Sequence, residues 1–198
     1  MIKNKCKIGI TGGIGSGKSQ ASAYLREKGY PVFSCDEING TLFLDKEYIQ
    51  KLQSIFPNCV VEGKIDKKCL AKTIFTSEEK RKQLNDLSHP LILDELFRQM
   101  EECEGPCFAE VPLLLENNLE KYFQKIIVLM RKRNSRLQSI VERDDCSLEN
   151  AEQKIQAQFP YESAFEEGWF QKDKFLLIFN DGTIENLKTQ IDTILKQL

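Results

Sequence analysis

Short apolar runs alternate with longer segments of helical periodicity along the chain. Five runs are apolar at nearly every position: CKIGIT (6–11), PVFSC (31–35), CFAEV (107–111), KIIVLM (125–130) and FLLIF (175–179). Continuous apolar runs of this length are typical of strands that are buried on both faces of a parallel sheet. The remaining segments predict helices over residues 18–28, 36–56, 67–75, 77–102, 131–145, 147–159 and 183–198. This alternation predicts a single α/β domain with a parallel sheet.

Polar residues mark where several of the predicted helices begin. Asp66 precedes one helix, and Ser77 opens the next one with an acidic first turn. Both residue types can accept a hydrogen bond from the N–H groups at a helix start. A turn at Gly63 predicts a brief extended piece, and His89-Pro90 predicts a bend in the long helix that follows.

The composition limits the classes of partner. The 198 residues suffice for one substantial core with a small appended subdomain. The 28 basic and 30 acidic residues nearly balance, so no broad basic field for nucleic acid is expected and an anion needs a local site. No apolar run approaches the roughly 20 residues of a membrane span. We therefore expect a cytoplasmic protein without nucleic-acid or membrane partners.

The cysteines are scattered along the chain. There are seven, none of them in a C-x-x-C pair, and His89 is the only histidine. A zinc site needs closely spaced ligands of these types, so it is disfavoured. This usage predicts small, reduced thiols in a reducing compartment.

A glycine-rich segment directly follows the first predicted strand. It matches G-x-x-x-x-G-K-S in full between a strand and a helix, which is the pattern of a nucleoside triphosphate site. Glycines let successive N–H groups point inward, and the helix start adds a partial positive charge. Lys18 is expected to reach the β- and γ-phosphates, and Ser19 to bind Mg²⁺. The residues predicted to hold ATP are Gly12, Gly13, Ile14, Gly15, Ser16, Gly17, Lys18, Ser19 and Gln20.

Other features narrow the class of P-loop protein. A GTPase carries N-K-x-D after a late strand, whereas the only Asn-Lys here is Asn4-Lys5, before the first strand. Motor and AAA-type ATPases usually need a longer chain. A small kinase fits best. A nucleoside monophosphate or sugar kinase, and a P-loop binding module without catalysis, remain as alternatives.

Several segments together resemble the dephospho-CoA kinase family: TGGIGSGKS (11–19), VFSCDEI (32–38), LNDLSHPLI (84–92), VPLLLEN (111–117) and Arg143-Asp144-Asp145. The resemblance implies transfer of the ATP γ-phosphate to the ribose 3′-hydroxyl of dephospho-CoA. It also implies a three-layer P-loop kinase fold. In that fold the nucleotide-binding core spans about 1–39, 106–134 and 172–198, a helical acceptor-binding insertion about 40–105, and a small lid about 135–171.

The resemblance assigns roles to two carboxylates near strand ends. Asp36 follows the second predicted strand, where a carboxylate can take or orient the proton of an attacking hydroxyl; its alternative role is to cap a helix beginning at Glu37. Glu110 could hold Mg²⁺ through water, and a structural role is an alternative for it.

The acceptor side of the predicted site rests on the same resemblance. His89, Pro112, Leu113 and Glu116 are expected to contact dephospho-CoA. His89 could instead be a packed helix residue, and Glu116 could anchor its own loop.

The predicted lid departs from the family pattern. Ser139 stands where the family has an arginine, and Arg136 lies one turn earlier on the same helical face. We hypothesise that Arg136 takes over phosphate clamping, the alternative being a solvated basic face. Arg143 is retained and is expected to offset charge on the transferred group together with Lys18. Ala164 replaces an expected lysine in a lengthened segment over 161–174. There, Trp169 and Phe170 are predicted to pack.

Overall fold

A five-stranded sheet forms the centre of the protein. The computed structural model describes residues 5–198. The strands are β1 (Cys6–Gly12), β2 (Val32–Ser34), β5 (Pro106–Glu110), β6 (Lys125–Met130) and β7 (Phe175–Phe179). Their order is β2-β5-β1-β6-β7, and β1 pairs in parallel with both β5 and β6, as β6 does with β7. The five predicted strands and their parallel pairing are therefore confirmed.

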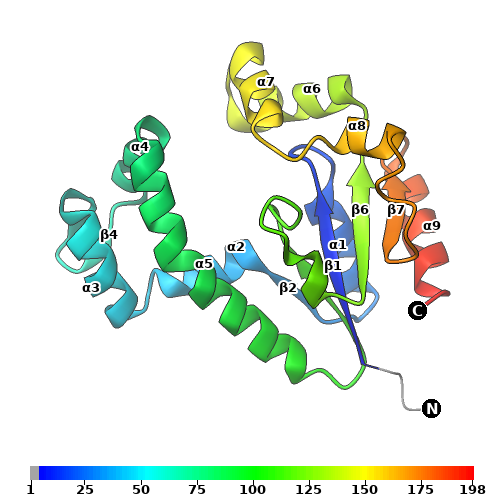
Figure 1. Cartoon of the computed structure of the whole chain (residues 1–198), viewed down its shortest axis with the longest axis horizontal. Helices are drawn as coiled ribbons and strands as arrows, with labels where there is room; N and C mark the ends of the chain where they lie inside the picture. Colours follow the sequence, from blue (N-terminus) through cyan, green and yellow to red (C-terminus); the bar gives the residue numbers. More distant parts are fainter. Residues whose placement is uncertain (1–4) are drawn as a thin grey trace. The chain divides into compact units, whose positions relative to one another are not determined.

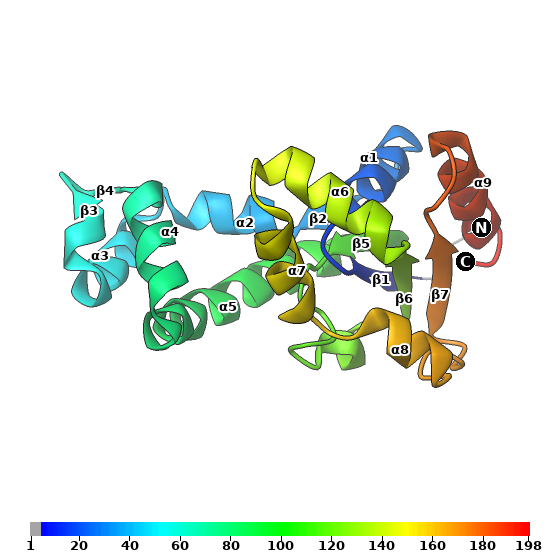
Figure 2. The same cartoon turned by 90° about the horizontal axis from the view of Figure 1, so that it is seen from above.

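Helices and loops cover both faces of this sheet. Figure 2 shows α1 (Lys18–Glu27) and α9 (Ile184–Leu195) together on one face and α8 (Tyr161–Glu166) on the other. Leu25 and Ile191 bury completely against Ile8 and Ile10 of β1 on the first face. On the second face a Cβ at Gly9 would lie 2.7 Å from a side-chain carbon of Leu114, so the loop after β5 packs directly on β1. The three-layer α/β fold is confirmed.

Local hydrogen bonds occupy both ends of the outer edge of β7. The Phe179 N–H donates to Oε1 of Gln190 at 2.9 Å, and Nε2 of Gln190 donates to the Phe179 carbonyl at 2.9 Å. At the other end of the strand, the Phe175 N–H donates to the carbonyl of Lys172 at 2.9 Å. A side chain and a turn therefore take hydrogen-bonding groups that an edge strand would otherwise present to solvent.

The predicted lid region contains three helices. These are α6 (Arg133–Asp144), α7 (Leu148–Gln156) and α8, and Figure 1 shows α8 close to the tip of β6. Buried aliphatic side chains hold α6 to α7. The sequence did not predict α8, whose short apolar pattern is irregular. An aromatic cluster fixes it, with ring centroids of neighbouring members 5.0–6.4 Å apart: Phe159, Tyr161, Trp169, Phe170 and Phe175. The predicted packing roles of Trp169 and Phe170 are confirmed.

The chain divides into two compact units. One contains the residues up to Val32 together with Glu102–Leu198, and the other is Phe33–Glu101. The second unit contains α2 (Cys35–Leu42), α3 (Lys46–Ile55), η1 (Pro57–Cys59), the hairpin of β3 (Val60–Val61) and β4 (Lys64–Ile65), α4 (Lys67–Thr76) and α5 (Glu78–Glu101). Its own core surrounds the buried Tyr48, Leu52 and Leu70.

Helix boundaries in the second unit differ from the prediction at one place. The single helix expected over 36–56 is divided, because Asp45 accepts a hydrogen bond from the Tyr48 N–H and starts a new helix. At His89-Pro90, where a bend is predicted, α5 continues as one helix through Pro90. The predicted caps are confirmed: Asp66 accepts from two N–H groups of α4, and Ser77 accepts from the Lys80 N–H.

The cysteine prediction was wrong for one pair. Cys59 and Cys69 form a disulfide between η1 and the first turn of α4. Sequence spacing did not reveal it because the hairpin between the two cysteines brings their Cα atoms to 5.3 Å, within the range that a disulfide spans. The other cysteines are thiols, as predicted: Cys6, Cys35, Cys103, Cys107 and Cys146. Within residues 5–198, no helix combines the length and apolar composition that crossing a bilayer requires.

Candidate active site

The glycine-rich loop lies between β1 and α1, as the sequence predicts. Gly15 and Gly17 have φ angles of +78° and +97°, a backbone region that residues with a Cβ rarely adopt. Gly17 is the N-cap of α1, so the N–H groups of the first helical turn face the loop. Such N–H groups, together with the positive end of the helix, form an anion-binding site.

The ammonium group of Lys18 lies in the concave side of this loop. Nζ donates to the carbonyl of Gly12 at 2.8 Å and to that of Gly13 at 3.2 Å. Carbonyl oxygens are weaker partners for an ammonium group than phosphate oxygens are, because a phosphate carries full negative charge. Lys18 can therefore exchange these contacts for phosphate oxygens without leaving the loop.

Ser19 and Glu110 form an oxygen pair beside the loop. Ser19 Oγ donates to Oε1 of Glu110 at 3.0 Å, and Glu110 is buried at the carboxyl end of β5. Hydroxyl and carboxylate oxygens suit Mg²⁺, which usually keeps several waters and takes phosphate ligands as well. In the described part of the chain, no group of three or more His, Cys, Asp or Glu residues could hold a metal by itself. The pair fits a Mg²⁺ ion that is shared with a nucleotide.

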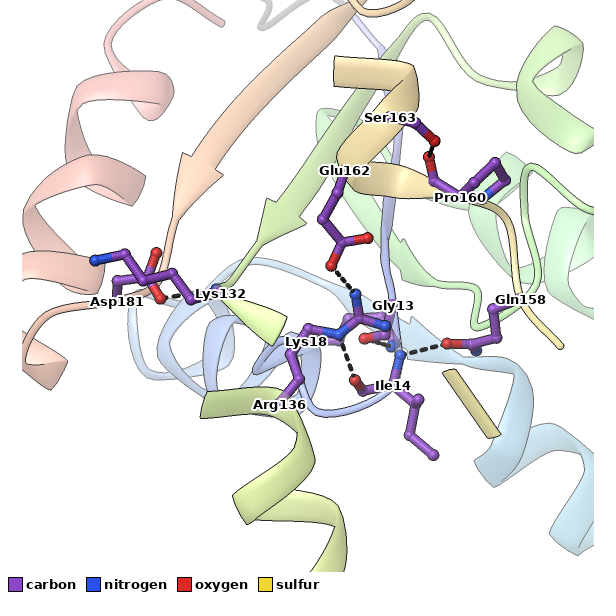
Figure 3. Close-up of polar contacts among 10 residues, drawn as sticks. All are labelled: Gly13, Ile14, Lys18, Lys132, Arg136, Gln158, Pro160, Glu162, Ser163 and Asp181. Carbon is purple, nitrogen blue, oxygen red and sulfur yellow. Dashed lines mark hydrogen bonds and ion pairs between the residues drawn. The ribbon is translucent and has the colours of Figure 1, made fainter. Parts of the chain in front are cut away.

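Side chains from the lid region hold the outer side of the loop (Figure 3). Oε1 of Gln158 accepts the Ile14 N–H at 2.6 Å, and Nε of Arg136 donates to the Ile14 carbonyl at 3.0 Å. Glu162 of α8 forms an ion pair with Nη1 of Arg136 at 2.5 Å. The lid region is thus bonded directly to the nucleotide loop.

Two residues after strand ends complete the support of the loop. Nδ2 of Asn180, which follows β7, donates to the Ser16 carbonyl at 2.9 Å in a buried position. Nη1 of Arg131, which follows β6, donates to the Gly15 carbonyl at 3.0 Å and to Oγ of Ser139 at 2.9 Å. Ser139 stands where the family pattern has an arginine, and it therefore accepts a hydrogen bond from Arg131, eight residues earlier.

Glu116 links the loop after β5 to the lid region. Its Oε1 accepts the Phe159 N–H at 2.9 Å. Nearby, the Tyr161 hydroxyl and Oγ1 of Thr11 are 3.1 Å apart, and burial raises the pKa of Tyr161 above its usual range. Glu116 thus has the anchoring role that the sequence left open.

Comparisons with known proteins match this arrangement along nearly the whole chain. The family described as Dephospho-CoA kinase matches residues 6–174. The chain belongs to the dephospho-CoA kinase family. A relative named dephospho-CoA kinase from Bacillus cereus (strain ATCC 10987 / NRS 248) is 36% identical over 96% of this chain and 95% of its own.

Two solved structures are similar to this dephospho-CoA kinase family member over its whole fold. A crystal structure of a Thermus thermophilus protein, TT1252, superposes with a TM-score of 0.81 at 31% identity over 99% of both chains. The dephospho-CoA kinase from Campylobacter jejuni gives a TM-score of 0.66 at 26% identity, covering 100% of this chain and 98% of its own.

Two of the residues predicted to form the site of this dephospho-CoA kinase family member lie in the compact unit Phe33–Glu101. Asp36 is exposed in the first turn of α2. Its alternative role as a cap was wrong, because α2 begins at Cys35 and Ser34 is the N-cap. His89 is half-buried on α5, and burial lowers its pKa, while the Asp86 carboxylate acts in the opposite direction.

The other predicted residues lie in the unit that carries the loop. Pro112 is half-buried and Leu113 exposed, directly after β5. Arg143 is exposed and makes two hydrogen bonds to Asp144 at 2.7 and 3.1 Å, which raise the pKa of Arg143 and lower that of Asp144. Arg136 and Arg143 are two helical turns apart on α6, about 10 Å along its axis.

Sequence reasoning missed several residues that hold the loop: Arg131, Gln158, Glu162 and Asn180. Arg131 and Asn180 each directly follow a strand of the sheet. Because ligand sites of α/β sheets lie at the carboxyl ends of strands, that position was an available signal for both. Glu162 lies in α8, which the sequence did not predict, and Gln158 precedes that helix, so no strand end marked either residue.

Proposed function

We propose that this chain uses ATP to phosphorylate the ribose 3′-hydroxyl of dephospho-CoA, giving CoA and ADP. The observation that carries the proposal is a complete nucleotide loop, with Lys18 in its concave side and Ser19 bonded to Glu110, in a member of the dephospho-CoA kinase family. The acceptor comes from the family, and the nucleotide site is what the chain's own geometry supports.

The residues of the loop act by positioning and by charge. Residues 12–20 hold the triphosphate through N–H groups, and Lys18 exchanges its carbonyl contacts for the phosphates. Ser19 and Glu110 hold Mg²⁺, the latter through water. When bound, this ion neutralises charge on the β- and γ-phosphates. Arg143 offsets charge on the transferred group after leaving Asp144.

The acceptor side is proposed from the family motifs. Asp36 accepts or orients the proton of the attacking hydroxyl, and His89, Pro112, Leu113 and Glu116 contact dephospho-CoA. Residues of about 40–105 form the acceptor-binding insertion and about 135–171 the lid. We place the reaction in the cytoplasm, where ATP is available.

The direct test is incubation of the chain with dephospho-CoA, ATP and Mg²⁺, followed by mass analysis of the product. We expect one added phosphate on dephospho-CoA and formation of ADP. A parallel panel holds AMP and gluconate as acceptors. Selective turnover of either would assign the chain to another class of small-molecule kinase and contradict the proposal.

The proposed role of Asp36 is tested by Asp36→Asn. A general base contributes typically 10²–10⁴-fold, so we expect kcat to fall by about that factor while the Kd for ATP stays unchanged. Glu37→Gln is the matched control, since Glu37 is the exposed neighbour in the same helical turn. Equal effects of the two changes on kcat would remove Asp36 from the chemical step.

A further inference from the structure

Both backbone polar groups of Ile14 are bonded to lid-region side chains. The Ile14 N–H donates to Gln158 at 2.6 Å, and the Ile14 carbonyl accepts from Arg136 at 3.0 Å (Figure 3). Ile14 lies in the middle of the nucleotide loop. The orientation of this one peptide segment is therefore set by residues 144 and 122 positions away in the sequence.

The guanidinium of Arg136 is committed to this arrangement. Only 3% of its side chain is exposed, and Glu162 supplies a counter-charge at 2.5 Å. The guanidinium also lies against Gly13, where an added Cβ would be 2.3 Å from Nη2. A buried charge that loses its partners is strongly destabilising, so Arg136 cannot move toward a phosphate without a large loss elsewhere.

We infer that Arg136 and Gln158 are positioning residues for nucleotide binding, and that Glu162 keeps Arg136 in place. They hold the Ile14 peptide, and thereby direct the neighbouring N–H groups of the loop toward the phosphates, without touching the nucleotide themselves. This differs from a phosphate-clamping role for Arg136. The inference rests on the proposed function only in taking ATP as the ligand of the loop.

The decisive variant is Glu162→Gln, because the two possible roles of Arg136 predict opposite changes in the Kd for ATP. If Arg136 bound phosphate, removal of its counter-charge would release positive charge toward the nucleotide and tighten ATP binding. If Arg136 positions Ile14, the same change loosens the loop and weakens ATP binding. We expect the Kd for ATP to rise about tenfold, the size of one lost charged hydrogen bond.

Arg136→Gln should raise the Kd for ATP, as Glu162→Gln does. Because both changes break one network, the double variant should bind ATP no more weakly than the weaker-binding single variant. Arg133→Gln and Glu152→Gln are matched controls. These residues form an exposed ion pair at 3.9 Å between α6, the helix that carries Arg136, and α7, and we expect less than a twofold change in Kd.

Hydrogen exchange gives a readout that needs neither nucleotide nor turnover. The Ile14 amide should exchange more rapidly in Arg136→Gln and in Gln158→Ala than in the parent chain and in Arg133→Gln. Gln158 is half-buried and loses only an acceptor, so Gln158→Ala serves if Arg136→Gln fails to fold. Tighter ATP binding by Glu162→Gln, or unchanged Ile14 exchange in Gln158→Ala, would overturn the inference.

The role of Arg136 and the reaction with dephospho-CoA can be tested independently. If dephospho-CoA proved not to be the acceptor, the exchange rate of the Ile14 amide and the Kd for ATP would still test the role of Arg136. Conversely, a chain that phosphorylates dephospho-CoA while Glu162→Gln binds ATP more tightly would keep its function and lose this account of Arg136.

Discussion

Gly13 and Gly40 are glycines in quite different surroundings. Gly13 does not have a positive φ, yet an added Cβ would meet the guanidinium of the buried Arg136 at 2.3 Å. Gly40 lies inside α2, and an added Cβ there meets nothing within 4 Å. Close approach of a side chain thus excludes a Cβ at Gly13, whereas Gly40 carries only the low helix propensity of glycine.

The difference gives a prediction at the residue scale. Gly13→Ala should lower the free energy of unfolding by about 1–3 kcal/mol, because overpacking displaces Arg136 from its partners. Urea denaturation measures the change. In an Arg136→Ala background the same substitution should cost clearly less, since the clashing group is gone.

Gly40→Ala is the control for that experiment. We expect it to raise the free energy of unfolding by up to about 1 kcal/mol, the difference in helix propensity between alanine and glycine. Equal destabilisation by Gly13→Ala in both backgrounds would contradict the role assigned to Arg136 at this position.

At the scale of single elements, the local sequence predicted most of the helices and strands. The strands were predictable because each is a continuous apolar run, and α4 was predictable from its cap, Asp66. Asp45 was missed as a cap because charged and apolar residues around it continue the helical period. Pro90 was expected to bend α5, and this helix of 24 residues continues through it without interruption.

The disulfide between Cys59 and Cys69 gives a prediction at the same scale. It closes a loop with a sequence separation of 10, which corresponds to about 2–3 kcal/mol of stabilisation in the chain-entropy estimate. Cys69→Ala should lower the free energy of unfolding by about that amount without reductant, and dithiothreitol should then have no further effect. Reduction of the parent chain should cause the same loss.

Thiol counting provides an independent check on this pair. In denaturant without reductant, five of the seven cysteines should react with an alkylating reagent, and all seven should react after reduction. Cys146→Ser is the control, since it changes a half-buried thiol outside the pair. Seven reactive thiols before reduction would exclude the disulfide in the isolated protein.

At the scale of the whole molecule, the site divides into a part that is contiguous in the sequence and a part that is not. The nucleotide loop was predictable because its residues are consecutive and each type has a chemical reason. Gln158 and Glu162 were not, because their role depends on tertiary contacts of a helix that the aromatic cluster fixes. Asp36 and His89 remain predictions as site residues.

His89 is the only histidine, and histidine is the side chain whose ordinary pKa lies between pH 5 and 8. Burial lowers its pKa, so the unfolded chain takes up the proton at a higher pH than the folded chain does. Stability contributed by neutral His89 is therefore present above about pH 6.5 and is lost as the pH falls below that value.

We expect the urea midpoint to fall between pH 7.5 and pH 5.5, and to fall less in His89→Gln. Carboxyl groups such as Glu95, whose pKa a hydrogen bond from Arg98 lowers to about 2, lose their contribution only at more acidic pH. If the urea midpoint falls by the same amount in the parent chain and in His89→Gln, His89 does not set the pH dependence of stability.

The local closure of β7 affects how neighbouring molecules meet. A strand at the margin of a sheet can template pairing with another chain, which leads to aggregation. Here the Gln190 amide occupies both backbone groups of Phe179, and Lys172 occupies the N–H of Phe175. An incoming strand from a second copy finds these hydrogen-bonding positions at both ends of the strand taken, which disfavours growth of fibres from this side.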